Sequence, residues 1–135
     1  MPFLEDLMGL GMPDQLAGIV SNDTVSSAPT RSVSTALTAA GTTIADALQL
    51  TSFVNVVSTA AASTGVKLSA SWPVGQIGFV QNNGANALNL FPPSASVAIN
   101  GGTLGAAVTI AAAAGNIIVR LSATDFGAYT VAKEA

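Results

Sequence analysis

The chain has 135 residues, about the length of one domain; half of them are hydrophobic, and only 8% are charged, against about 25% in an ordinary soluble domain. It contains no His and no Cys, which excludes Ser-His-Asp and Cys-His nucleophilic sites, disulfides and thiolate zinc sites. A net charge of -3 with four basic residues argues against a surface that follows nucleic-acid phosphates. We therefore expect a protein that is not an enzyme, holds no cofactor or metal ion, and binds no nucleic acid.

The apolar surplus of this chain requires a partner. A domain of this size leaves much of its surface in water, so it cannot bury half of its residues alone. No run of about 20 residues lacks Gly, Pro, Asn, Ser and Thr, as a membrane-spanning helix would require. The N-terminus carries Glu5 and Asp6 but no basic residue before Arg31, the reverse of a secretory signal. We therefore expect no membrane partner and predict a homo-oligomer.

Residues 1–43 are predicted to form an N-terminal arm. Apolar residues recur at helical spacing after Pro2 and again after Pro13, which predicts two short helices. The Ser/Thr/Ala-rich stretch from Ser21 to Thr43 cannot bury enough surface to order itself, so it is predicted to be an extended linker. The helices either pack as a hairpin on their own subunit or dock as a peg into another protein. Their apolar residues are the candidate contacts: Phe3, Leu4, Leu7, Met8, Leu16, Ile19 and Val20.

Residues 44–135 are predicted to form an all-β body. From Ala47 onward the apolar period is two, and turn residues separate about seven or eight short strands. This pattern is typical of an antiparallel β-sandwich or jelly roll. The two parts, 1–43 and 44–135, are therefore expected to differ in structure and in role.

Two hairpins define the predicted strand register. Between Gly75 and Pro93, Asn83-Gly84 suits a two-residue type I′ turn, which needs φ > 0 at both central residues. That turn would place Phe79 opposite Leu88 and Ile77 opposite Leu90, with their side chains directed inward. The second predicted hairpin joins 106–111 to 117–122 through Ala114-Gly115. It would pair Ile110 with Val119 and Val108 with Leu121.

Few residues in the body are candidates for chemistry. Asp46 and Asp125 are the acidic pair that a glycoside hydrolase would need, but both are more typical of turns or caps. Lys67 could serve a Ser-Lys dyad, although an isolated Lys is commoner as a solvated edge residue. Trp72, in a loop beside a proline, could stack on a sugar but is more often a plug in a core or an interface. The candidate subunit contacts are Trp72, Phe91 and Arg120, and we expect Arg120 to make a polar contact across a subunit boundary.

Several short motifs follow one another between Ala47 and Leu121. They are Asn55-Val56-Val57, Gly65-Val66-Lys67-Leu68, Gly75 to Val80, Asn82 to Leu88, Phe91-Pro92-Pro93 and Ile99-Asn100-Gly101. In this order they resemble a family of small tailed-phage virion proteins, and Leu10-Gly11-Met12-Pro13 is similar to segments near the start of such proteins. The resemblance implies a jelly-roll or sandwich subunit, commonly a trimer, on the outside of a bacteriophage capsid or in a tail fibre.

The leading functional hypothesis is a structural protein, a capsid cement or decoration subunit on the exterior of the virion. The body would form a homotrimer, and the arm would bind the major capsid protein, so the apolar residues of its two helices become candidate capsid contacts. The alternative is the receptor- or glycan-binding knob of a head or tail fibre, with a host surface glycan as partner. Under the leading hypothesis, removal of residues 1–43 should leave a folded oligomer that no longer binds particles.

Overall fold

The computed structural model divides the chain into two units, Met1–Thr30 and Arg31–Ala135, and describes residues 32–132. The helices predicted before Ser21 lie outside the described residues. Within 32–132 the protein is all-β, which confirms that part of the prediction, and contains no helix. The strands are β1 (Val33–Thr38), β2 (Leu48–Gln49), β3 (Val54–Thr59), β4 (Gly65–Lys67), β5 (Ile77–Asn82), β6 (Leu88–Phe91), β7 (Ala98–Ile99), β8 (Val108–Ile110), β9 (Ala114–Ser122) and β10 (Asp125–Ala132).

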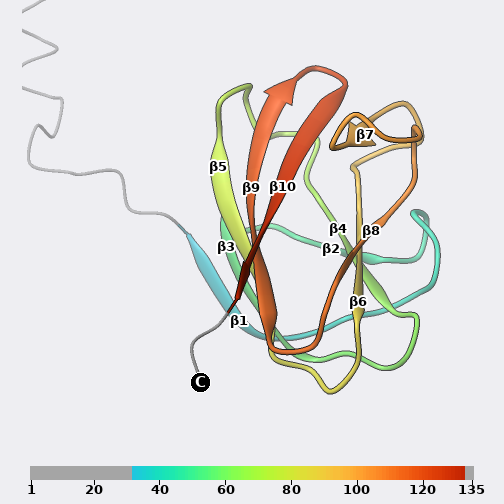
Figure 1. The fold of residues 1–135 in the computed structure, drawn as a ribbon, viewed down its shortest axis with the longest axis vertical. Coiled ribbons are helices and arrows are strands. Elements are labelled where there is room, and N and C mark those ends of the chain that lie inside the picture. Colours follow the sequence, from blue (N-terminus) through green and yellow to red (C-terminus); the bar gives the residue numbers. More distant parts are fainter. Residues whose placement is uncertain (1–31, 133–135) are drawn as a thin grey trace, which may run out of the picture. The chain divides into compact units, whose positions relative to one another are not determined.

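The first six strands alternate between two sheets (Figure 1). Sheet A has the order β1-β3-β5-β9-β10-β7, and sheet B has the order β2-β4-β6-β8. Strands β1, β3 and β5 are parallel to one another, and so are β2, β4 and β6. Each turn of the chain therefore adds one strand to each sheet and stacks on the turn before it. The fold is a β-solenoid-like coil, and the predicted antiparallel jelly roll or sandwich is wrong.

The central predicted hairpin does not form. Strands β5 and β6 lie in different sheets, so Phe79 pairs with Val54 and Ile117, whereas Leu88 pairs with Ile110. Neither Asn83 nor Gly84 has a positive φ, so the type I′ turn is absent as well. Alternating apolar residues suit two strands that pack face to face as well as two strands that pair edge to edge. The predicted register assumed that the two strands pair edge to edge, whereas in the structure they lie in different sheets and face each other.

The side chain of Asn82 holds the arch between β5 and β6. It is fully buried; its Nδ2 donates to the carbonyl of Asn86 (2.9 Å) and to that of Ile110 (3.1 Å). Its Oδ1 accepts a hydrogen bond from the backbone N–H of Gly84 (2.9 Å). These bonds satisfy backbone groups that a hairpin ladder would otherwise pair. The Asn-Gly signal in the sequence thus marks an arch between two sheets.

The C-terminal strands close one end of the coil. Strand β9 lies antiparallel between β5 and β10, and β8 lies antiparallel beside β6. The second predicted hairpin is therefore also wrong, because β8 and β9 belong to different sheets. Val119 pairs with Ile77 and Gly127, and Ile110 pairs with Leu88. Strand β9 pairs with the edge of β5, the last of the parallel strands β1, β3 and β5, and β10 pairs with β9.

Strand β1 lies within the stretch that was predicted to be a linker. It pairs with β3 through Val33, Leu37 and Thr38, and the following Ala39 is buried. The boundary at residue 43 is therefore too late, because the body already includes Val33. Sequence composition missed this strand because its Ser, Thr and Ala residues carry little burial signal of their own.

The connection from β1 to β2 is closed by Asp46. Its Oδ1 accepts hydrogen bonds from Thr43 Oγ1 (2.7 Å), from the Thr43 N–H (2.7 Å) and from the Thr42 N–H (3.1 Å). These bonds, the one from the Thr43 hydroxyl first, lower the pKa of the Asp46 carboxyl below its ordinary value. The stabilisation from these bonds is fully present above the pKa that the Asp46 carboxyl has in the unfolded chain. It is lost as the pH falls through the lowered pKa of this carboxyl in the folded protein.

One hydrophobic core lies between the two sheets. Trp72 belongs to it, with its ring centroid 5.5 Å from that of Phe53 and 6.1 Å from that of Phe126. A Cβ on Gly78 would overlap the Trp72 ring, so the glycine makes room for it. Each large side chain buried here contributes roughly 1.5–3 kcal/mol. The inward residues include Val57, Val80, Ile118 and Phe126 from sheet A and Val66, Leu88, Leu90 and Ile110 from sheet B.

Candidate interaction surface

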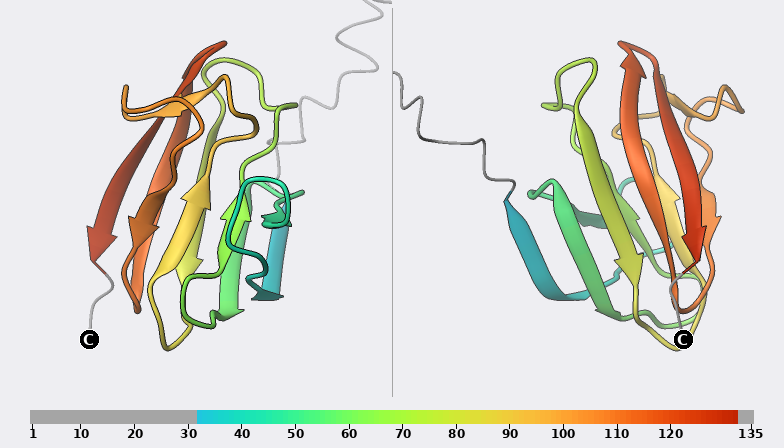
Figure 2. Two further views of the ribbon diagram at one scale, coloured as in Figure 1. Left: turned by 90° about the vertical axis from the view of Figure 1, so that its right-hand side faces the viewer. Right: turned by 60° about the vertical axis from the view of Figure 1, so that its left-hand side comes forward.

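The outer face of sheet A carries a continuous line of apolar side chains. Residues that stand directly opposite one another on five neighbouring strands form it, and we name this line the apolar row. The right-hand view of Figure 2 shows the five strands β1, β3, β5, β9 and β10 side by side. The apolar row consists of Val33, Val54, Phe79, Ile117 and Tyr129.

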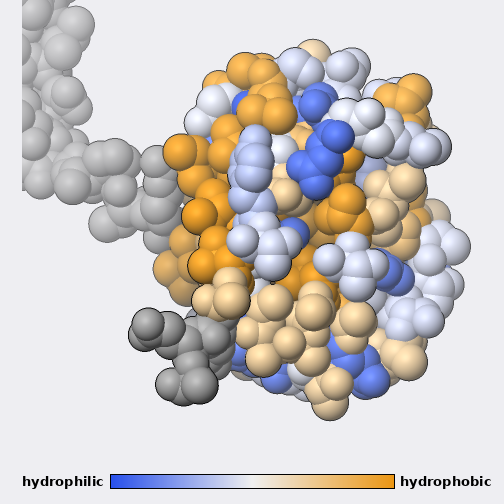
Figure 3. All heavy atoms as spheres, viewed as in Figure 1, coloured by the Kyte–Doolittle hydropathy of each residue, from blue (hydrophilic) through white to orange (hydrophobic). Residues whose placement is uncertain are grey.

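Further apolar residues flank the apolar row on the same face. Ile77 stands opposite Val119 on one side, and Gln81, Gly115 and Val131 stand in line on the other. Ile77 is 52% exposed and Tyr129 is 53% exposed, far above what core residues show. In Figure 3 hydrophobic side chains gather along the side of the molecule formed by β5 and β9. The apolar row and the residues named here on either side of it include no charged residue.

A glycine lies beneath each of two aromatic rings on this face. A Cβ on Gly115 would lie 2.6 Å from Cζ of Phe79, and one on Gly127 would lie 2.7 Å from the hydroxyl oxygen of Tyr129. Both aromatic rings therefore lie down on a glycine of the sheet, an arrangement that also compensates for the missing side chain. Two sheets can pack against each other through apolar faces of this kind.

Arg120 is the one basic residue in the strands of sheet A, and its side chain does not lie on the outer face. Arg120, on β9, is directed toward the loop after β4 and the turn between β9 and β10, and the carbon of its guanidinium lies 4.9 Å from the centroid of the Phe126 ring. The guanidinium donates to four carbonyls of its own chain: those of Ala70 (3.0 Å), Trp72 (3.2 Å), Ser122 (3.1 Å) and Ala123 (2.8 Å).

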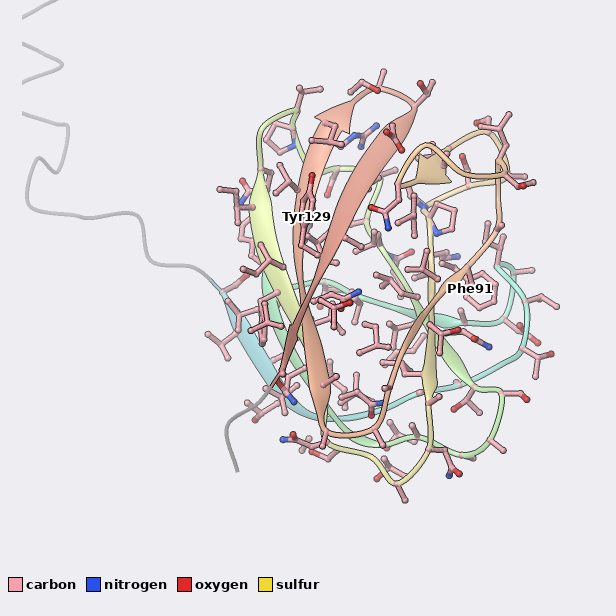
Figure 4. All side chains as sticks on the ribbon, viewed as in Figure 1. Phe91 and Tyr129 are labelled. Carbon is pink, nitrogen blue, oxygen red and sulfur yellow. The ribbon has the colours of Figure 1, made fainter. Side chains whose placement is uncertain are left out.

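The three predicted subunit contacts are all engaged within the chain. Trp72 is 5% exposed in the core, and Arg120 binds the carbonyls given above. Phe91 is 8% exposed and lies over Gly65 on sheet B, away from Tyr129 (Figure 4). Their role at a subunit boundary stays a prediction. The candidate capsid contacts Phe3, Leu4, Leu7, Met8, Leu16, Ile19 and Val20 lie outside the described residues.

Sequence analysis missed the residues of the apolar row as a surface. Ile77 and Phe79 were expected to point inward, but Gly78 and Val80 take the inward positions of β5 and leave the larger residues outside. A signal was present, because Ile77 to Val80 in β5 and Ile117 to Val119 in β9 are unbroken apolar runs. Such runs are typical of strands covered on both faces, as in parallel sheets.

The described residues 32–132 contain no pocket and no group of three or more His, Cys, Asp or Glu side chains that could hold a metal ion. They also contain no helix with the length and hydrophobicity needed to cross a membrane. Asp46 accepts backbone hydrogen bonds in a turn, and Asp125, the first residue of β10, accepts one from the N–H of Gly101 (3.0 Å). The most prominent feature of this part is thus a surface, the outer face of sheet A. Comparison of the chain with family models, with curated proteins and with solved structures gave no match.

Proposed function

We propose that the protein is a structural subunit of a bacteriophage virion, a capsid decoration or cement protein that associates with copies of itself. In this role it lies on the exterior of the capsid as a homotrimer and binds the major capsid protein, which stabilises the head. The observation that carries the proposal is the charge-free apolar row on an exposed sheet face. Contiguous apolar surface of this kind marks a site of protein association. The resemblance between residues 47–121 and small virion proteins supplies the kind of assembly.

The glycan-binding alternative depends on exposed aromatic rings that sit beside polar groups. Trp72, the residue that suggested it, is buried between Phe53 and Phe126. Tyr129 is exposed, but its neighbours on the face are Ile117 and the flanking Val131. No contact within the described residues favours a sugar site, so the structural role is the one we propose.

A particle-binding assay tests the proposal. Heads of the phage that encodes the chain, prepared without this protein, are mixed with the full chain and with a variant that lacks residues 1–31. The full chain should sediment with the heads and raise the temperature at which they release DNA. The shortened variant should stay folded by circular dichroism and remain in the supernatant, because the candidate capsid contacts are in the deleted part.

Each outcome of this assay has a definite meaning. Sedimentation of the shortened variant would move the attachment site into the β-body and keep the virion role. Absence of the full chain from sedimented heads, together with its absence from purified virions by immunoblot, would overturn the proposed function.

A further inference from the structure

We infer that the apolar row is the self-association surface of the protein, covered by a second copy of the same chain through its own sheet A. The inference deepens the proposed function, on which it rests for the expectation that the subunits associate. It names the surface and the occupant, neither of which follows from a virion role alone. Val54, Phe79 and Ile117 form the centre of this surface, and Ile77, Tyr129 and Val131 lie around them.

The size of the face fits the central part of a contact between subunits. The apolar row crosses five strands, and its flanks extend it to about five residues along β5, β9 and β10 only, which gives a footprint of roughly 300 Å² from strand spacing and rise. This footprint is smaller than the roughly 800 Å² that each partner contributes to a standard interface, so residues around the face would have to join the contact. It lies at the lower end of the range of about 300–600 Å² in which the largest patch on a monomer is often functional.

The charge distribution favours a second copy over a charged partner. The apolar row contains no Asp, Glu, Lys or Arg, and the flanking Gln81 is neutral. Two such faces can meet without burying an unpaired ion, which would oppose association. A partner with a charged surface would gain no opposite charge here. The face is thus complementary to itself in charge.

Most edges of the sheets are poor alternatives to this face. Strand β1, at one edge of sheet A, has register shifts after Ser34 and after Leu37, and its Ala36 has a φ of 57°. Strands β7, β2 and β8 have two, two and three residues. Bulged or very short edge strands resist the addition of further strands. The exception is β10, which pairs with β7 only through Asp125 and Phe126, so its later residues form an edge that competes with the face of sheet A.

Two symmetries would cover the apolar row. Across a two-fold axis the face meets itself, whereas around a three-fold axis three faces enclose the axis. The mass of the oligomer distinguishes them. A dimer would leave the inference standing and overturn the trimer of the proposed function, so the two can fail separately.

The test uses the full chain and two lysine variants of matched charge. Ile117→Lys places a cation in the centre of the apolar row, at a side chain 40% exposed and thus tolerant of replacement. Thr109→Lys adds the same charge to the exposed outer face of sheet B. Sedimentation velocity should show an oligomer for the wild type and Thr109→Lys, and the 13.3 kDa monomer for Ile117→Lys. We expect at least a tenfold rise in the dissociation constant for Ile117→Lys.

A second measurement covers the case in which Ile117→Lys does not fold. The chain has no Cys, so Ile117→Cys and Thr109→Cys each carry a single thiol. Maleimide labelling of the first should slow as protein concentration rises through the dissociation constant, while labelling of the second should not change.

Several results would overturn the inference. One is a wild-type monomer at about 10 µM, which with particle binding intact would assign the apolar row to the capsid. Another is a monomer that associates only after residues 1–31 are removed, which would assign the row to the chain's own N-terminal segment. The third is an oligomer that survives Ile117→Lys with concentration-independent labelling of Ile117→Cys. Self-association that is lost in Ile117→Lys, without any binding to heads, would support the inference and count against the virion role.

Discussion

The outer faces of the two sheets differ in chemistry, although the same coil builds both. On sheet B, Gln49, Lys67 and Phe91 stand in one row and Gly65, Asn89 and Thr109 in another. On sheet A, the corresponding positions form the apolar row and its flanks. Sheet B thus has mainly polar residues on its outer face, whereas sheet A carries the apolar row on its outer face and the buried polar residues Asn55, Asn82 and Asn116 on its inner side.

The two strand cations follow the same division. Lys67 of β4 lies on the outer face of sheet B, but Arg120 of β9 donates to carbonyls of its own chain instead of entering the apolar row. A coil fixes which residues point outward but leaves their chemistry to the sequence. This difference supports the proposal that sheet A carries the association surface.

Removal of a strand from sheet A alone should break this comparison most severely. A variant that lacks residues 1–43 loses β1, the Val33 end of the apolar row and the core contact of Leu37. We expect its free energy of unfolding to fall by at least about 3 kcal/mol, the typical cost of deleting a core-packed Leu. It should also aggregate, because β3 becomes an unprotected edge. This outcome replaces the earlier expectation that the body survives loss of residues 1–43.

The variant that lacks residues 1–31 is the control for this prediction, since it keeps every strand of both sheets. Thermal unfolding followed by circular dichroism, together with light scattering, compares the two variants. Equal stability and equal scattering would mean that β1 contributes nothing to the body.

Replacement of the two strand cations should have unequal effects. Arg120→Met removes charge-assisted hydrogen bonds to four carbonyls, so we expect a loss of about 2 kcal/mol in the free energy of unfolding. Lys67→Met alters an outer side chain and should change that free energy by less than about 0.5 kcal/mol. Urea denaturation at one fixed protein concentration measures both. Similar losses for the two variants would contradict the conclusion that the hydrogen bonds of Arg120 to its own chain stabilise the fold.

The smallest difference is expected between the glycines beneath the two phenylalanines. A Cβ on Gly65 would lie 2.6 Å from Cε2 of Phe91 and 2.9 Å from the backbone oxygen of Asn89, which cannot move aside. Gly65→Ala should therefore cost about 1–3 kcal/mol. On Gly115 the neighbours are the ends of the Phe79 and Gln81 side chains, so Gly115→Ala should cost less than about 1 kcal/mol.

Chemical denaturation of both glycine variants measures this difference. An equal cost would mean that Phe79 is held as firmly on its outer face as the nearly buried Phe91. In that case the apolar row would be rigid before any partner binds.

The all-β class and the positions of several strands could be predicted from the sequence, but the pairing of strands and the β-solenoid-like arrangement could not. The all-β class was correct, and the positions of β5, β6 and β9 follow the apolar alternation. The outward direction of Phe79 was missed, because the hairpin interpretation required it to face Leu88. The incorrect prediction of a type I′ turn at Asn83-Gly84 is therefore the reason why the candidate surface was not predicted.

What the sequence determined by itself is the period of two and, with it, the sets of residues that share a face of each strand. That period follows from local backbone geometry. Only the tertiary structure decided whether neighbouring strands pair within a sheet or face each other across the core. The decision depends on distant groups: Asn82 holds the arch through the carbonyl of Ile110, 28 residues away, and β5 is completed by β3 and β9. A pattern confined to one strand carries no information about such partners. The same alternation of apolar residues is therefore compatible with the predicted hairpin and with the coil that the protein forms.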